Sequence, residues 1–412
     1  MTETRQALRG AGILALAGVV AAGAGWLTLV VVARTRGPSE YADFSVVWSV
    51  YFGIAGVLIG LQQETTRSLV AARREPRRIG LVGAGAWTTL TVVLAALLVG
   101  ATALALGGVN VADVSMVAGP ALLAIPLLAA AVMVNGALAA DGRWNVLAGL
   151  ALGDQFVRFG LVIVVVQVAP SEVAYGAAMV AGLICFIPFI AIGWSRRPAI
   201  AGTRSGFVGR SAAAMVSSGC ANVLVVGLPA LITATGEASD RAHGVLFAAI
   251  LLTRTPVLLL ANSVRPVVVR VFVANRSSLR AWAWRVAPVV VLATTVAVAI
   301  GWALGPWLLR LLFGSDFRVS GELMACLVLA AVLILLQTWT GVALAAIDRD
   351  VASTVGWLVA VVIAVGCLLL PVGLEERTAS ALLAGPGVGM AIHLAVLRMS
   401  PGEARRPDQR EV

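Results

Sequence analysis

The chain has 412 residues, of which 60% are hydrophobic and 12% are charged, and its mean hydropathy is +0.97. Soluble domains carry nearer to ~25% charged residues, so this composition excludes an ordinary soluble protein. The net charge is +10, and every basic residue is arginine. The arginines lie mostly in short segments between apolar stretches, which is the pattern of membrane topology signals and argues against nucleic acid as a partner. We expect one membrane unit with no separate soluble catalytic domain.

About a dozen apolar stretches follow one another along the chain. The first, 10–33, contains no charged residue. Roughly 20 apolar residues cross ~30 Å of hydrocarbon as a helix, and only a helix satisfies its own backbone there. We therefore predict an all-α polytopic membrane protein. Its twelve spans are expected at 10–33, 42–65, 79–106, 117–140, 144–168, 172–194, 207–233, 245–270, 282–309, 319–345, 351–371 and 378–397.

The distribution of arginine indicates which side of the membrane each loop faces. If the N-terminus is inside, the inside segments carry many more arginines than the opposite loops, and cytoplasmic loops are the arginine-rich ones. We predict a multi-pass protein of the cell (cytoplasmic) membrane with both termini cytoplasmic and a short polar tail over 401–412. The arginines assigned to the inside include Arg67, Arg73, Arg74, Arg77, Arg78, Arg196, Arg197, Arg204, Arg276 and Arg280.

A short repeat divides the spans into two groups. Residues 137–143 read ALAADGR and residues 343–349 read ALAAIDR, and each closes a predicted span six spans apart from the other. We predict two six-helix halves, 1–200 and 201–400, around a central cavity. Parallel repeats of this kind hold substrate between the halves and alternate access by rocking. Chance similarity among Ala-, Leu- and Val-rich helices is the alternative explanation.

Two arginines lie inside the predicted span 245–270, where an ionisable group marks a functional site by default. Arg254 and Arg265 are about three helical turns apart, so they share one helix face at a separation of ~16 Å. Asn262 lies between them. Because guanidinium groups match phosphate oxygens, we interpret these three residues as a cavity site for an anionic, phosphate-bearing substrate. The alternatives are that Arg265 extends to the membrane surface and that both arginines pair with carboxylates.

The other in-span charges are candidates for gating or ion coupling. Glu64 aligns with Arg265 across the repeat, which suggests a pair between the halves, and the alternative is a local pair with Arg67 at i, i+3. Asp154 and Arg158 are spaced i, i+4 in span 144–168 and are expected to pair on one helix face. A role of this pair in the cavity or in ion coupling is the alternative to a purely internal ion pair.

Several motifs are absent from the sequence. It contains no Walker A, GxSxG, HExxH or TVGYG sequence, which disfavours an ATP-driven pump, common hydrolases and a potassium channel. The cysteines lie inside apolar spans without metal-ligand spacing. We therefore expect no catalytic residues, no metal and no cofactor. The cysteines are Cys185, Cys220, Cys326 and Cys367.

Twelve spans in two halves resemble the multidrug/oligosaccharidyl-lipid/polysaccharide (MOP) exporter superfamily, and most of all its polysaccharide-transporter or O-antigen-flippase type. The segments that carry the resemblance are TRGPSEYADFSVVWSV (35–50), LQQETTRSLVAARR (61–74), LLRLLFGSDF (308–317) and the DGR and IDR hinges. The chain lacks the carboxylate in span one that drug and cation antiporters often carry, and the two extra spans of lipid II flippases.

The resemblance implies an alternating-access flippase that moves a polyprenyl-pyrophosphate-linked oligosaccharide across the membrane for cell-surface polysaccharide assembly. It implies that Arg254 and Arg265 contact the pyrophosphate or an acidic sugar, and that the partners are the lipid-linked glycan, membrane lipid and polysaccharide-assembly proteins. A cation-coupled multidrug exporter is the alternative within transport. A membrane glycosyltransferase or polymerase is disfavoured because no predicted loop exceeds roughly 15 residues. A non-transporting partner of a cell-wall assembly is a third alternative.

Overall fold

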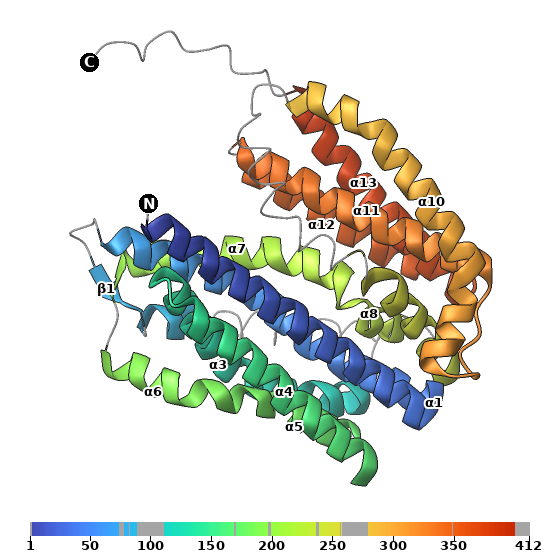
Figure 1. Cartoon of the computed structure of the whole chain (residues 1–412), viewed down its shortest axis with the longest axis horizontal. Coiled ribbons are helices and arrows are strands. Elements are labelled where there is room, and N and C mark those ends of the chain that lie inside the picture. The colour runs from blue at the N-terminus through green and yellow to red at the C-terminus, as the bar shows by residue number, and fades with distance from the viewer. Residues whose placement is uncertain are drawn as a thin grey trace. The chain divides into compact units, whose positions relative to one another are not determined.

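The computed structural model describes residues 2–73, 78–81, 83–88, 111–168, 170–196, 199–235, 239–255, 257, 279–347 and 349–399. Nearly all of these residues are helical (Figure 1). The first part of the chain contains α1 (Thr2–Ala72), β1 (Arg78–Gly80), α3 (Val111–Ala140), α4 (Trp144–Val168), α5 (Glu172–Ala181), η1 (Gly182–Phe186), α6 (Ile187–Arg196), β2 (Ala199–Ala201), α7 (Arg204–Val225) and α8 (Leu228–Ala234). An unlabelled helix covers 240–255, followed by α10 (Leu279–Phe313), α11 (Gly321–Ala346), α12 (Asp350–Leu368) and α13 (Leu374–Met399).

The described helices confirm a polytopic all-α membrane protein. Seven of them are long and apolar enough to cross a bilayer, and an eighth is formed if the bent pair α7 and α8 counts as one span. Helix α4 has the same bounds as the predicted span 144–168. The predicted spans 79–106 and 245–270 lie mostly outside the described residues, as does the tail 401–412, although residues 79–80 belong to β1 rather than to a helix.

One predicted span is bent in the structure, and a second is a single span that changes helix type along its length. The span 207–233 bends by 72° between α7 and α8, because Pro229 in the first turn of α8 has no N–H with which to continue the preceding helix. The span 172–194 is divided into α5, the 3₁₀ turn η1 and α6. Neither the bend nor the change of helix type can be predicted from apolar composition alone, which guided the placement of the spans.

Helix α1 contains the first two predicted spans, 10–33 and 42–65, as two arms. A straight helix of 71 residues would extend over ~107 Å, far more than a bilayer is thick. Gly37 interrupts it with φ 78° and ψ −177°, a conformation that side chains disfavour. A Cβ at Gly25 would lie 3.5 Å from the ring of Trp48, so the arms pack against each other antiparallel around Gly37.

Contacts between loops show which of them share an end of the bundle. Strand β1 pairs antiparallel with β2, with Ile79 opposite Ile200, and joins the segment after α1 to the segment before α7. At the same end Arg73 contacts the hinge residue Asp141. All of these segments were predicted on the inside. The contacts therefore fit the predicted alternation of loops, without identifying which end is cytoplasmic.

The repeated hinges also match in geometry. In the first hinge the N–H of Arg143 donates to the carbonyl of Leu138 at 2.9 Å, and in the second the N–H of Arg349 donates to Leu344 at 3.0 Å. This bond across five residues is the closing bond of a Schellman helix end. Gly142 supplies the left-handed residue of the first hinge with φ 67°. The sequence repeat thus corresponds to one structural motif used twice.

The chain packs into two compact units. Unit 1 contains residues 1–247 and 312–316, and unit 2 contains 248–311 and 317–412. In unit 1 the arms of α1 contact α3, α4 and α7, and in unit 2 α13 contacts α11 and α12. The packing boundary differs from the predicted repeat boundary at 200–201 because α7 and α8 pack on α1. The division into six-span halves stays a prediction, since a repeat boundary is defined by sequence and not by packing.

Glycines allow α7 to approach the second arm of α1 closely. A Cβ at Gly60 would collide with the backbone of Ala214 and Met215, and one at Gly56 would collide with Asn222. The side-chain amide of Asn222 donates to the carbonyl of Gly56 at 3.4 Å. Small residues that bring helix backbones together are a main source of association in membranes.

We predict that Gly60→Ala destabilises the protein. The atoms that the new Cβ would meet belong to the backbone of α7 and not to a movable side chain, so α1 and α7 must move apart. Overpacking of this kind costs ~1–3 kcal/mol. The measurement is the thermal unfolding midpoint in detergent. Gly53→Ala is the matched control, since a Cβ at Gly53 has no neighbour within 4 Å. Equal midpoints for the two variants would contradict the close packing of α1 and α7.

Candidate functional site

Arg158 and Asp154 form the ion pair that their spacing predicts. Arg158 Nη2 lies 2.7 Å from Asp154 Oδ1 and 2.8 Å from Oδ2, and the Arg158 side chain is only 2% exposed. Tyr51 accepts from the same nitrogen at 3.1 Å, and the carbonyl of Met179 accepts from Nε at 3.1 Å. Gln155 Oε1 accepts from Nη1 at 3.1 Å. The guanidinium therefore has partners on all three of its nitrogens.

Aromatic rings and a glycine complete the surroundings of Arg158. The guanidinium carbon lies 4.9 Å from the ring centroid of Tyr51 and 5.1 Å from that of Phe52, within the range of cation–π contact. A Cβ at Gly182 would collide with the carboxylate of Asp154, so η1 approaches α4 where the ion pair lies. The pair links α4 to the second arm of α1 and to α5. This geometry corresponds to the internal-pair interpretation of Asp154 and Arg158.

Glu64 lies on the second arm of α1, and its side chain is buried against α7. Its side chain is 4% exposed, and Oε1 lies 2.6 Å from Nε of Arg210 and 2.7 Å from the hydroxyl of Ser68. Arg67, the local partner considered from sequence, lies 4.0 Å away and is 75% exposed. The structure therefore places Glu64 against Arg210. Arg265, the partner expected from the repeat, lies outside the described residues.

The predicted anion site is described only in part. Arg254 lies in the helix 240–255 and is 4% exposed, so protein surrounds its side chain. Arg265 and Asn262 lie outside the described residues. Three arginines but one acidic residue are buried among the residues with described side chains, namely Arg158, Arg254, Arg377 and Glu64. The described interior is therefore richer in buried cations than in buried carboxylates.

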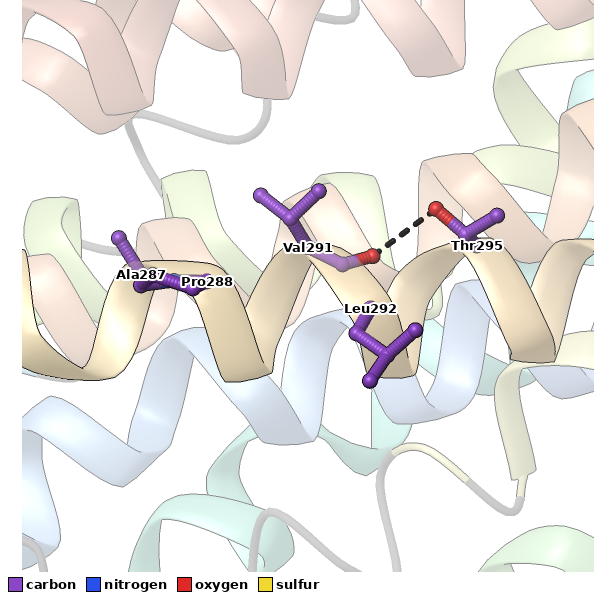
Figure 2. A pocket seen from close by; sticks show the side chains of 5 residues that line it. All are labelled: Ala287, Pro288, Val291, Leu292 and Thr295. Atoms are coloured by element: carbon purple, nitrogen blue, oxygen red, sulfur yellow. Dashed lines mark hydrogen bonds between the residues drawn. The ribbon is translucent and has the colours of Figure 1, made fainter.

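A shallow groove of 520 Å³ runs along α10 (Figure 2). It is lined by Ala287, Pro288, Val291, Leu292 and Thr295. The hydroxyl of Thr295, the only polar side chain among them, donates to the carbonyl of Val291 at 3.0 Å, as threonines in helices commonly do. The groove therefore offers no charged group to an anion, and it does not account for the predicted substrate site.

No cluster of three or more His, Cys, Asp or Glu suited to a metal ion occurs in the part of the chain that the structure describes. The four cysteines are free thiols. Neither observation assigns a cofactor or metal to these residues.

Sequence reasoning missed several members of these networks. Arg210 is the fourth residue of the predicted span 207–233. An arginine inside a predicted span could have indicated a functional or paired residue at this position. Tyr51, Phe52 and Ser68 carry no signal in a single sequence, because their roles depend on which helix faces them. His393 is completely buried.

No family model matches the chain. Two proteins of Mycobacterium tuberculosis (strain H37Rv) match nearly its whole length. Rv1510 is 33% identical over 401 residues, covering 91% of this chain and 87% of its own, and Rv3630 is 31% identical over 401 residues, covering 92% and 90%. The chain belongs to the family of these mycobacterial proteins. Both members carry the description "uncharacterized protein", so the family relationship by itself brings no function.

Solved structures show that this chain has the fold of MOP-superfamily transporters, as the resemblance implied. An inward-facing multidrug resistance MATE transporter matches with a TM-score of 0.66 at 15% identity, covering 90% of this chain and 94% of that chain. The lipid II flippase MurJ matches with a TM-score of 0.67 at 11% identity, covering 93% and 87%. A MOP transporter from Pyrococcus furiosus, described as having a binding pocket of reversed polarity, matches with a TM-score of 0.58 at 16% identity, covering 95% of both chains.

We predict that Arg158→Leu lowers the free energy of unfolding by ~3–5 kcal/mol, because it leaves the carboxylate of Asp154 without its cation. Adding Asp154→Asn to that variant removes the charge and recovers part of the loss. The measurement is thermal unfolding in detergent, with Arg67→Leu as the exposed control. An Arg158→Leu variant as stable as Arg67→Leu would contradict a structural role for the pair.

Proposed function

We propose that this protein is an alternating-access flippase for polyprenyl-pyrophosphate-linked oligosaccharides, acting in the cell membrane with both termini cytoplasmic. The observation that carries the proposal is the match of nearly the whole chain to MOP-superfamily transporters, among them a lipid II flippase. Such a fold supports movement of a substrate between two half-structures rather than covalent chemistry. Polysaccharide-assembly proteins are the proposed partners, because a flipped glycan requires a protein that uses it.

The charges of the described interior favour an anionic substrate over a cationic one. Glu64 contacts Arg210 and Asp154 contacts Arg158, so each carboxylate is already matched by a guanidinium. A cationic drug would have to displace one of these arginines. A pyrophosphate would instead gain from buried guanidinium groups, of which Arg254 is the proposed contact, together with Arg265 and Asn262.

A cation-coupled multidrug exporter is the second candidate, supported by the likeness to a multidrug resistance MATE transporter. The pairing of Glu64 with Arg210 and of Asp154 with Arg158 argues against it, since a coupling cation needs a carboxylate that is available. A membrane glycosyltransferase or polymerase is a weaker alternative, because the neighbours in fold are named as transporters and flippases.

Glu64 and Arg210 are the proposed gate. They join the second arm of α1, in the predicted N-terminal half, to α7, in the predicted C-terminal half. An ion pair that closes one end of the pathway must separate when that end opens, and the carboxylate of Glu64, which is 4% exposed, then needs another partner. Asp154 and Arg158 are proposed to keep the N-terminal helices together while the gate opens.

We predict that Arg254→Ala loses at least ~10-fold in the transport of a fluorescent polyprenyl-pyrophosphate glycan in proteoliposomes, because a charge-assisted contact is lost. Arg254→Lys keeps the positive charge but cannot form two parallel hydrogen bonds to one phosphate group. Its transport rate is expected to lie between those of the wild type and Arg254→Ala. Arg310→Ala, on an exposed arginine of α10, is the control.

Three results of this assay would count against the proposal. Transport by Arg254→Ala at the wild-type rate would overturn the assignment of the site but not the function. A wild-type protein that exports cationic dyes and no glycan would favour the drug exporter. A folded wild-type protein that moves neither substrate would exclude both forms of transport.

We predict that Arg210→Glu and Glu64→Arg each abolish most transport, since each places two like charges in the gate. The double exchange restores the pair with reversed polarity and is expected to recover transport. Arg67→Gln, which removes only the exposed charge beside Glu64 and adds no like charge, is the matched control. If the double variant is folded but no more active than either single variant, the pair is not a gate.

A further inference from the structure

His393 is enclosed by three helices of unit 2. It lies on α13 and has no exposed surface. Glycines on the surrounding helices leave room for its ring. A Cβ at Gly356 of α12 would collide with the imidazole, and a Cβ at Gly341 of α11 would lie 3.6 Å from its Cε1. An ionisable side chain inside a membrane protein is costly to retain, so its surroundings require an explanation.

The first ring nitrogen of His393 is fixed as a donor. Nε2 lies 3.0 Å from the backbone carbonyl of Ser353 on α12. A carbonyl only accepts hydrogen bonds, so Nε2 carries a proton whatever the charge of the ring. The second nitrogen, Nδ1, is therefore the position where the neutral and the charged imidazole differ.

Nδ1 faces a hydroxyl that satisfies either form. It lies 3.0 Å from Oγ1 of Thr340 on α11, and that hydroxyl also lies 3.0 Å from the carbonyl of Gln337. With a neutral ring, the Thr340 hydroxyl donates to Nδ1. With a protonated ring, Nδ1–H donates to the hydroxyl oxygen, and the hydroxyl donates to Gln337. A rotation of one hydroxyl converts one arrangement into the other without moving a heavy atom.

The charged groups near this site lie at the ends of its helices. Asp350 begins α12 one turn before Ser353, Arg349 precedes it in the hinge, and Arg398 is near the end of α13, all three with exposed side chains. The described part of α11 between Glu322 and the hinge has no charged residue. The described charges around His393 therefore lie toward the exposed ends of the helices.

We propose that His393 is a proton-binding site in unit 2, with Thr340 as the hydroxyl that accommodates the proton. The proton comes from water at the α11–α12 hinge and adds to the lone pair of Nδ1, so the ring gains one positive charge and no bond to a heavy atom breaks. The Thr340 hydroxyl turns its own proton toward Gln337. The proposal also rests on the proposed function in one respect: we propose that this proton couples to transport.

The test of proton binding is ¹⁵N NMR of the full chain labelled at histidine, which has only two such residues. The His393→Gln variant assigns the signals. As the pH is lowered from about 8 to about 5, Nδ1 is expected to change from unprotonated to protonated while Nε2 stays protonated. A His393 Nδ1 that stays unprotonated throughout this range, in folded protein, would overturn the site.

Thr340→Val is the second variant, and it does not depend on His393→Gln being folded. Valine has nearly the shape of threonine but has no hydroxyl to donate to neutral Nδ1 or to accept from the protonated ring. The bond from the charged ring is stronger than the bond to the neutral ring, so the two forms are not affected equally, and the midpoint of the His393 titration is expected to shift by about half a pH unit or more from that of the wild type. An unchanged midpoint in a folded variant would overturn the role of Thr340. Thr354→Val, on a half-buried threonine of α12 whose hydroxyl donates to the carbonyl of Asp350, is the control.

Transport assays separate the coupling from the function. An imposed proton gradient is expected to stimulate glycan transport by the wild type at least twofold and to leave His393→Gln unstimulated. A wild type that transports glycan without responding to the gradient would overturn the coupling alone. A wild type that transports no glycan would overturn the proposed function and the coupling with it, while the NMR titration still decides proton binding.

Discussion

Hydrocarbon offers no partner to a polar group, and the structure is arranged around that constraint. Every charged side chain that enters the membrane has to find its partner inside the protein, and Glu64 and Arg158 do so with groups on other helices. The same requirement makes the fold depend on specific helix neighbours. Displacing α7 from α1 would expose the carboxylate of Glu64 as well as apolar surface, so charge pairing and helix order reinforce each other.

Glycine provides the second half of this arrangement. Association of helices in lipid gains little from the hydrophobic effect, so it depends on close contact between backbones. Gly60 allows that contact between α1 and α7, Gly182 provides space for the carboxylate of Asp154, and Gly356 provides space for the imidazole of His393. In each case the glycine is on one helix, and the group that packs against it is on another. Small residues therefore determine where polar groups can be buried.

Much of the fold was predictable because the bilayer imposes a single length and a single secondary structure. The bounds of α4 and the two arms of α1 follow from apolar length alone, and the i, i+4 spacing indicates the pair of Asp154 and Arg158. The bend between α7 and α8 was missed, although Pro229 could have indicated it. The partner of Glu64 was not predictable from the repeat, because a repeat gives equivalent positions and not contacts. The network around His393 required three helices to be placed in space.

The tip of the α1 hairpin has a consequence for how the chain enters the membrane. The two arms meet at Gly37, so the first two spans are suited to insert together as one helical hairpin, whose tip crosses the bilayer in the proposed orientation. The tip region carries Arg34 and Arg36 but also Glu40 and Asp43, and these formal charges cancel. Moving one charge against the membrane potential costs ~2.3 kcal/mol per 100 mV. A tip with no net charge lets that potential neither oppose nor favour insertion, so in the proposed orientation the arginines of the predicted inside segments decide which way the hairpin faces.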